Sequence, residues 1–144
     1  MATLKFGIKA HSENPTKTVV EARNFKIIVD EPKNLGGTDD GPNPVEYVLA
    51  AFAGCLNVVG HLVAREMDIP LRGIEIEMEG DLDPAKFMGK DTEERAGYKE
   101  IRVSLKPDAD AEEETLQAWM TAVKARCPVS DNLANATPVK VTLK

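Results

Sequence analysis

Residues 43–67, with the sequence NPVEYVLAAFAGCLNVVGHLVAREM, decide the fold of this chain of 144 residues. Asn43 suits the N-cap of a helix, Pro44 suits its first position, and Glu46 completes a capping-box pattern three residues after the cap. Apolar residues then recur with helical spacing, at positions 45, 48, 49, 52, 55, 56, 59, 62 and 63. The pattern predicts one helix that ends near Met67 and is about 34 Å long.

The opposite side of this predicted helix carries small residues, namely Ala50, Ala53, Gly54 and Gly60. Small side chains let another backbone approach closely, and the simplest such neighbour is the same helix of a second copy. We therefore expect the helix to be buried nearly all round.

Alternating apolar and polar residues predict short strands on both sides of this helix. A turn-rich loop at 30–42 precedes the helix, and a second helix is expected at 110–126 because its acidic and basic ends match the helix dipole. The predicted strands lie at about 3–10, 16–22, 24–30, 71–80, 98–106 and 138–143. This order indicates an α+β fold, in a single domain that covers residues 1–144.

The composition excludes several classes of partner. The net charge is -6, with 42% hydrophobic and 29% charged residues, as in a soluble globular protein. Nucleic acid and anionic membranes both reward clustered Lys and Arg, so neither is expected as a partner. The first residues lack a signal-peptide core, and Glu46, Asn57 and His61 interrupt the apolar run from 45 to 63. We expect no membrane association and a cytoplasmic location.

The two cysteines have different settings. Cys55 lies on the apolar face of the long helix, which favours a buried core residue with a raised thiol pKa. Cys127 precedes Pro128, which is suited to open a new helical turn with Cys127 as its N-cap. There, backbone N–H groups and Arg126 would stabilise a thiolate. In the alternative interpretation, the Cys-Pro pair merely ends the preceding helix.

No metal site or cofactor is expected. The 72-residue separation of the cysteines excludes a local CxxC motif, and neither His11 nor His61 has ligand spacing. His61 is more simply interpreted as a partly satisfied helix histidine.

Residues 36–55, GGTDDGPNPVEYVLAAFAGC, together with RCPV at 126–129, resemble the OsmC/Ohr family of osmotically inducible and organic hydroperoxide resistance proteins. The resemblance implies an OsmC-like fold, in which a long central helix packs against curved antiparallel sheets. It also implies an intertwined homodimer with its active sites at the dimer interface.

The resemblance further implies a thiol-dependent peroxidase. Cys55 would attack an organic hydroperoxide, and Cys127, the more accessible thiol, would resolve the product to a disulfide that an external dithiol reduces. An arginine would stabilise the thiolate, and Arg23 is the one arginine that precedes Cys55. The resemblance also makes Glu46 a candidate site residue, one residue after the place of the family's glutamate. It lies nine residues before Cys55 on the opposite helical face, so it is not expected to act on Cys55 of its own chain.

A second function stays open beside the first. Val45 follows the Asn-Pro pair where the best-known peroxidases of the family have the glutamate, and Glu46 comes one residue later. This register favours a non-enzymatic OsmC-like dimer that binds a small apolar or thiol-reactive ligand in the interface pocket. The distance between the two sulfurs separates the two hypotheses, because only a redox pair needs them within a few ångströms.

Overall fold

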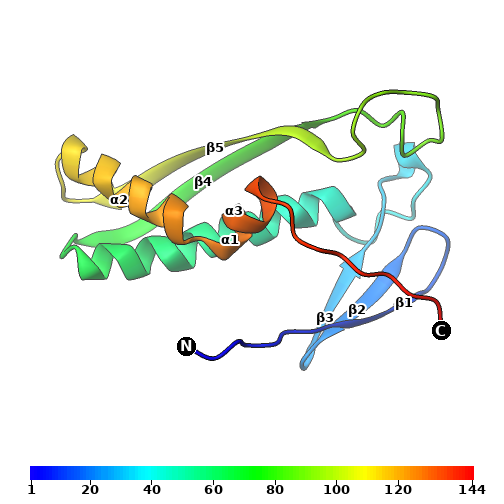
Figure 1. Ribbon diagram of the computed structural model, residues 1–144, viewed down its shortest axis with the longest axis horizontal. Helices are drawn as coiled ribbons and strands as arrows, with labels where there is room; N and C mark the ends of the chain where they lie inside the picture. The colour runs from blue at the N-terminus through cyan, green and yellow to red at the C-terminus, as the bar shows by residue number, and fades with distance from the viewer. The chain divides into compact units, whose positions relative to one another are not determined.

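The computed structural model describes residues 1–144, which form helices and antiparallel strands (Figure 1). The chain divides into two compact units, Met1–Ala50 and Ala51–Lys144. Helix α1 (Pro44–Glu66) runs through the boundary between them. The α+β fold class is confirmed, whereas the single domain over 1–144 stays a prediction.

The first unit contains a three-stranded antiparallel sheet in the order β1-β2-β3. Its strands are β1 (Lys9–Ser12), β2 (Thr18–Ala22) and β3 (Phe25–Val29). The second and third predicted strands are thus confirmed. The first, expected at 3–10, is wrong before Lys9, because β1 pairs only along β2 and residues 3–8 find no partner strand in the chain.

A buried carboxylate organises the loop that follows β3. Asp30 has no exposed surface, and its oxygens accept hydrogen bonds from the Thr16 hydroxyl, from the Thr38 hydroxyl and N–H, and from the N–H groups of Glu31 and Asp40. These bonds satisfy a charge that would otherwise be costly to bury. The turn-rich segment is therefore an ordered loop, with one turn of 3-10 helix, η1 (Lys33–Leu35), inside it.

The start of α1 is fixed by its own cap and by β3. Asn43 Oδ1 accepts from the Glu46 N–H at 2.8 Å, and Glu46 Oε1 accepts from the Asn43 N–H at 2.9 Å. This is the predicted capping box. The Tyr47 hydroxyl donates to the carbonyl of Ile28 at 2.6 Å, which ties the first turn of the helix to the sheet.

The second unit is built on a long antiparallel ribbon of β4 (Leu71–Leu82) and β5 (Tyr98–Ala109). Helix α2 (Glu113–Arg126) follows the ribbon, and the short α3 (Pro128–Ala134) follows α2 after one residue. The predicted strands at 71–80 and 98–106 and the second helix are confirmed. The strand expected at 138–143 is wrong, because that segment has no ladder partner in the chain and stays exposed.

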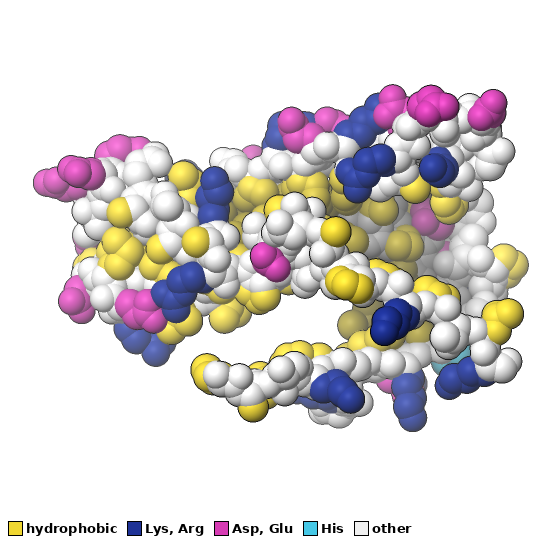
Figure 2. Space-filling model, in the orientation of Figure 1, with side chains coloured by type: hydrophobic (Ala, Val, Ile, Leu, Met, Phe, Trp, Pro, Cys, Tyr) yellow, Lys and Arg dark blue, Asp and Glu magenta, His cyan; other side chains and the backbone are white.

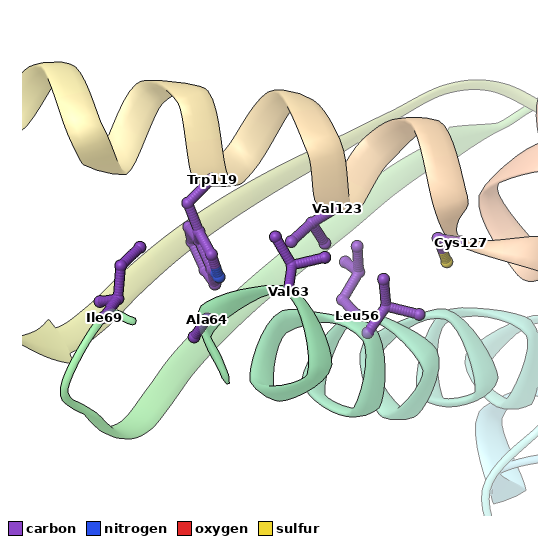
Figure 3. Packing of buried hydrophobic residues seen from close by; sticks show 8 residues of the cluster. Leu56, Val63, Ala64, Ile69, Trp119, Val123 and Cys127 are labelled. Atoms are coloured by element: carbon purple, nitrogen blue, oxygen red, sulfur yellow. The ribbon is translucent and has the colours of Figure 1, made fainter. Parts of the chain in front are cut away.

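The core of the second unit lies between the two helices and the inner face of the ribbon. Figure 3 shows Trp119 and Val123 of α2 pointing toward Val63 of α1. The Trp119 indole N–H donates to the carbonyl of Gly60 at 2.8 Å, so the polar end of this buried ring is satisfied. The full set of buried core residues is Leu56, Val59, Val63, Ala64, Ile69, Trp119, Val123 and Cys127.

Within the single chain, α1 is not buried all round, and its expected burial against a second copy stays a prediction. Its buried residues all lie in its C-terminal half, between Leu56 and Ala64. Val58 is 67% exposed and Leu62 is 41% exposed, and a Cβ added at Gly54 would meet no atom within 4 Å. Hydrophobic side chains consequently remain on the surface of both units (Figure 2).

By length and composition alone, α1 would be able to cross a membrane. Core helices of soluble proteins have the same property, and the C-terminal half of α1 forms the core of the second unit. The expected cytoplasmic location stays a prediction.

Candidate functional site: two thiols at the start of α3

The structure brings the two cysteines together. The Cys127 S–H donates to Cys55 Sγ, with 2.9 Å between the sulfurs, and both thiols are free. Cys55 comes from α1, and Cys127 is the single residue between α2 and α3. A disulfide bond is about 2.05 Å long, so a movement of about 1 Å would bring the sulfurs to bonding distance. The geometry is that of a dithiol able to form an intramolecular disulfide.

Cys127 caps two helices, as the C-cap of α2 and the N-cap of α3. Its N–H donates to the carbonyl of Val123 at 3.1 Å, which closes α2, and its sulfur accepts from the Ser130 N–H at 3.4 Å, which caps α3. Pro128 occupies the first position of α3, where a missing N–H costs nothing. The interpretation of Cys127 as an N-cap is confirmed over the alternative that Cys-Pro merely ends a helix.

The accessibility of the two thiols is the reverse of the expectation. Cys127 is 1% exposed, whereas Cys55 is half-buried. Cys127 packs into the cluster formed by α1 and α2, while Cys55 lies at the edge of that cluster. The expectation that Cys127 is the more accessible thiol is therefore wrong.

Burial raises the pKa of the Cys55 thiol, because the thiolate loses solvation. The neighbouring Cys127 sulfur raises this pKa further, because negative charge there opposes ionisation of Cys55, and the backbone N–H of Val129 lowers it.

Arg126, which the sequence predicts to stabilise the Cys127 thiolate, has a carboxylate partner in the structure, and its effect on the thiol stays a prediction. Its guanidinium pairs with the Glu66 carboxylate at the end of α1, at 2.5 Å and 3.2 Å, and this contact holds the pKa of Glu66 below its ordinary value. Sequence reasoning missed Glu66. Its placement gave a signal, because a carboxylate in the last turn of a helix opposes the dipole and calls for a cationic partner.

The other two predicted site residues belong to the first unit. Arg23 has a positive φ of 56° in the turn between β2 and β3, and its guanidinium carbon lies 5.1 Å from the centre of the Phe25 ring. Glu46 is engaged in the capping box with Asn43. Cys55 and Cys127 lie in the second unit. Catalytic roles for Arg23 and Glu46 stay predictions.

Two further features bear on ligand binding. His61 Nδ1 is 3.0 Å from the carbonyl of Asn57, so the interpretation as a satisfied helix histidine is confirmed. No group of three or more His, Cys, Asp and Glu side chains has the proximity of a metal site. A depression of about 370 Å³ lies on the β4–β5 ribbon, and neither cysteine lines it.

Several solved structures have this fold. An OsmC-like protein from Mycoplasma pneumoniae is 21% identical with a TM-score of 0.80, and the alignment covers 92% of this chain and 89% of that one. An organic hydroperoxide resistance protein OsmC from Legionella pneumophila is 23% identical with a TM-score of 0.66, covering 92% and 91%. An organic hydroperoxide resistance protein from Elizabethkingia anophelis, with thiocyanate bound, is 23% identical with a TM-score of 0.67, covering 91% and 89%.

No curated protein sequence matches the chain significantly. The sequence profile of the OsmC-like protein family matches residues 37–142, a range that includes α1 and both cysteines. With its α+β architecture and its similarity to solved OsmC-like structures, the chain belongs to the OsmC-like protein family.

Proposed function

We propose that this protein is a thiol-dependent peroxidase that reduces organic hydroperoxides. The observation that carries the proposal is the 2.9 Å contact between two free thiols that are 72 residues apart in the sequence. A purely structural cysteine pair in a reducing compartment gains nothing from such an approach, whereas a redox pair requires it.

The proposed reaction has three steps. The Cys55 thiolate attacks one peroxide oxygen, the O–O bond breaks, and the alkoxide takes a proton to leave as an alcohol, with Cys55 now a sulfenic acid. The Cys127 sulfur then attacks the Cys55 sulfur and releases water, which forms the disulfide. An external dithiol finally reduces that disulfide by thiol exchange and is itself oxidised.

The difference in accessibility supports these roles. A hydroperoxide has to reach the attacking thiol from solvent, and Cys55 is the thiol with exposed surface. The resolving thiol needs only to reach its partner, so the burial of Cys127 is no obstacle. Phe52 and Val129 pack against the same apolar cluster as Cys55, and these apolar surroundings favour an organic peroxide over hydrogen peroxide.

A homodimer is part of the proposal. Exposed apolar residues alternate at both ends of the chain, at Leu4, Phe6 and Ile8 and again at Val139, Val141 and Leu143. Such segments pair readily with another chain. In this dimer, we propose that Arg23 stabilises the thiolate and that Glu46 takes part in the same site.

Peroxide turnover with dithiothreitol as reductant tests the proposal directly. Cumene hydroperoxide should be consumed catalytically by the wild-type protein, and Cys55→Ser should remove this activity. Cys127→Ser should keep the first turnover but accumulate sulfinic acid on Cys55, read from the protein mass. A wild-type protein that consumes no organic hydroperoxide with any dithiol would refute the proposed function.

A second candidate is a non-enzymatic dimer that binds a thiol-reactive or small apolar ligand. Two observations favour this binding function. The pKa of the Cys55 thiol is raised, so the thiol is not activated, and the guanidinium of Arg126 is paired with Glu66. Native mass spectrometry separates the two functions. A retained ligand or adduct supports binding, whereas an unmodified mass together with peroxide turnover supports the enzyme.

A further inference from the structure

We propose that the Arg126–Glu66 ion pair is a positioning device that keeps Cys127 against Cys55 and so favours their disulfide. Neither residue touches a reacting sulfur in this assignment. The effect on disulfide formation follows from the geometry alone, and its consequence for peroxide turnover rests on the proposed function.

The ion pair joins the end of α1 to the end of α2, and the sulfur contact joins α1 to the residue that directly follows α2. Glu66 is the last residue of α1, and Arg126 is the last residue of α2, directly before Cys127. Both terminal nitrogens of the guanidinium contact the carboxylate, with Nη1 at 2.5 Å from Oε2 and Nη2 at 3.2 Å from Oε1. A two-point contact of this kind fixes direction as well as distance.

Because Arg126 directly precedes Cys127, the ion pair acts mainly on the position of that residue. Only Cys127 separates α2 from α3, so the residue that follows Arg126 carries the resolving sulfur. The sulfur is held from its other side by the Ser130 N–H at the start of α3. When Arg126 is released, α2 loses its polar tie to the end of α1, and the sulfur gains freedom to move away from Cys55.

The alternative is that this pair serves general stability. Its two side chains are 41% and 51% exposed, and exposed ion pairs of this kind contribute little to the free energy of unfolding. Glu66 also opposes the dipole of its own helix. A contact of small net stability whose arginine directly precedes Cys127 is better explained by the position that it enforces on that residue.

The quantity that tests this proposal is the equilibrium constant for forming the Cys55–Cys127 disulfide. The two thiols lose two electrons and two protons, and glutathione disulfide takes them up to become two glutathione thiols. An ion pair that raises the effective concentration of Cys127 at Cys55 raises the equilibrium constant of this exchange. By reciprocity, closing the disulfide also strengthens the ion pair.

The experiment titrates the protein with glutathione buffers and counts alkylated cysteines by mass. Glu66→Gln should lower the equilibrium constant about two- to fivefold, the range expected from loss of an exposed ion pair. This corresponds to roughly 9 to 21 mV at about 30 mV per tenfold change. The charge swap Glu66→Arg with Arg126→Glu should recover most of the loss, and 1 M salt should bring the wild-type value toward that of Glu66→Gln.

Asp108→Asn is the matched control, because it removes one partner of another exposed arginine contact, that of Arg72, which is remote from the cysteines in the sequence. It should leave the equilibrium constant unchanged. The proposal is overturned if Glu66→Gln and Glu66→Arg, both folded by circular dichroism, keep the wild-type constant. The titration uses no peroxide. A lowered equilibrium constant in Glu66→Gln, together with a wild-type protein that shows no peroxide turnover, would refute the proposed function and still support this inference.

Discussion

At the scale of single residues, Cys127 combines the duties of helix cap and resolving thiol. Serine at this position would keep the N-cap and remove the second sulfur. Because the contact with Cys127 raises the pKa of Cys55, Cys127→Ser should lower that pKa. Alkylation of Cys55 by iodoacetamide should then be faster than in the wild type at pH 7, and its pH profile should move to lower pH. A profile that moves the other way would contradict the assigned effect of the sulfur contact.

Asp30 gives a prediction for acid stability. Burial raises the pKa of its carboxyl, but the bonds from Thr38, Glu31, Thr16 and Asp40 outweigh burial and hold this pKa well below the ordinary range. The folded state therefore binds the proton less readily than the unfolded state. The contribution of Asp30 to stability is full above about pH 4 and is lost as the pH falls below that value.

Asp30→Asn should remove this acid dependence and lower the melting temperature at pH 7 by about 5–10 °C, because the amide NH₂ of Asn has to face donors. Thermal unfolding followed by circular dichroism between pH 3 and pH 7 measures both effects. Asp131→Asn, at an exposed position in α3, is the control and should leave the curve nearly unchanged.

At this scale, contacts between residues that are close in the sequence are predicted correctly, whereas contacts between distant residues are not. The capping box of Asn43 and Glu46 and the N-cap at Cys127 depend on neighbours three residues away, so their patterns were readable. The Arg126–Glu66 pair spans 60 residues, and the burial of Cys127 depends on how α2 packs on α1. Neither follows from local pattern, and the accessibility of the two thiols was accordingly predicted in the wrong order.

At the scale of elements, the two glycines of α1 have different roles. From the sequence, Gly54 and Gly60 are both assigned to the small-residue side of the predicted helix. In the structure, a Cβ at Gly60 would lie 2.7 Å from Ile74 Cδ1 and 3.1 Å from Trp119 Cζ2, whereas one at Gly54 meets nothing within 4 Å. Gly60 therefore permits the contact between α1, α2 and the ribbon, and Gly54 is free of such contacts within the chain.

Gly60→Ala should destabilise the second unit by about 1–3 kcal/mol, because the added methyl overfills a packed site. Gly54→Ala is the matched control, since it adds the same methyl to the same helix with space available and a gain in helix propensity. Denaturant unfolding with the same probe for both variants measures the difference. Equal destabilisation by both variants would show that helix geometry, and not packing, is what matters at Gly60.

Strand prediction failed only at the ends of the chain. The four inner strands have partners within the chain, so alternation and pairing agree for them. Residues 3–8 and 138–143 show the same alternation without a partner. A period of two in the sequence indicates that a segment is suited to a sheet, but it does not say which chain provides the neighbouring strand.

At the scale of the whole molecule, the exposed apolar residues predict a mass in solution twice that of the 15.7 kDa chain. Val58→Glu should shift this equilibrium toward the monomer, because it places a charge on the exposed apolar side of α1. Ala125→Glu, on the exposed surface of α2, is the control. Sedimentation equilibrium at several protein concentrations measures both. A wild-type chain that stays monomeric at 100 μM would contradict the homodimer.

The bond between Trp119 and Gly60 has a spectroscopic consequence. Trp119 is the single tryptophan of the chain, so tryptophan emission comes from the second unit alone and the first unit is silent in that signal. Circular dichroism, in contrast, sums over both units. Overlay of the two melting curves would therefore show the units to unfold as one cooperative body, and a gap between the curves would resolve their separate transitions.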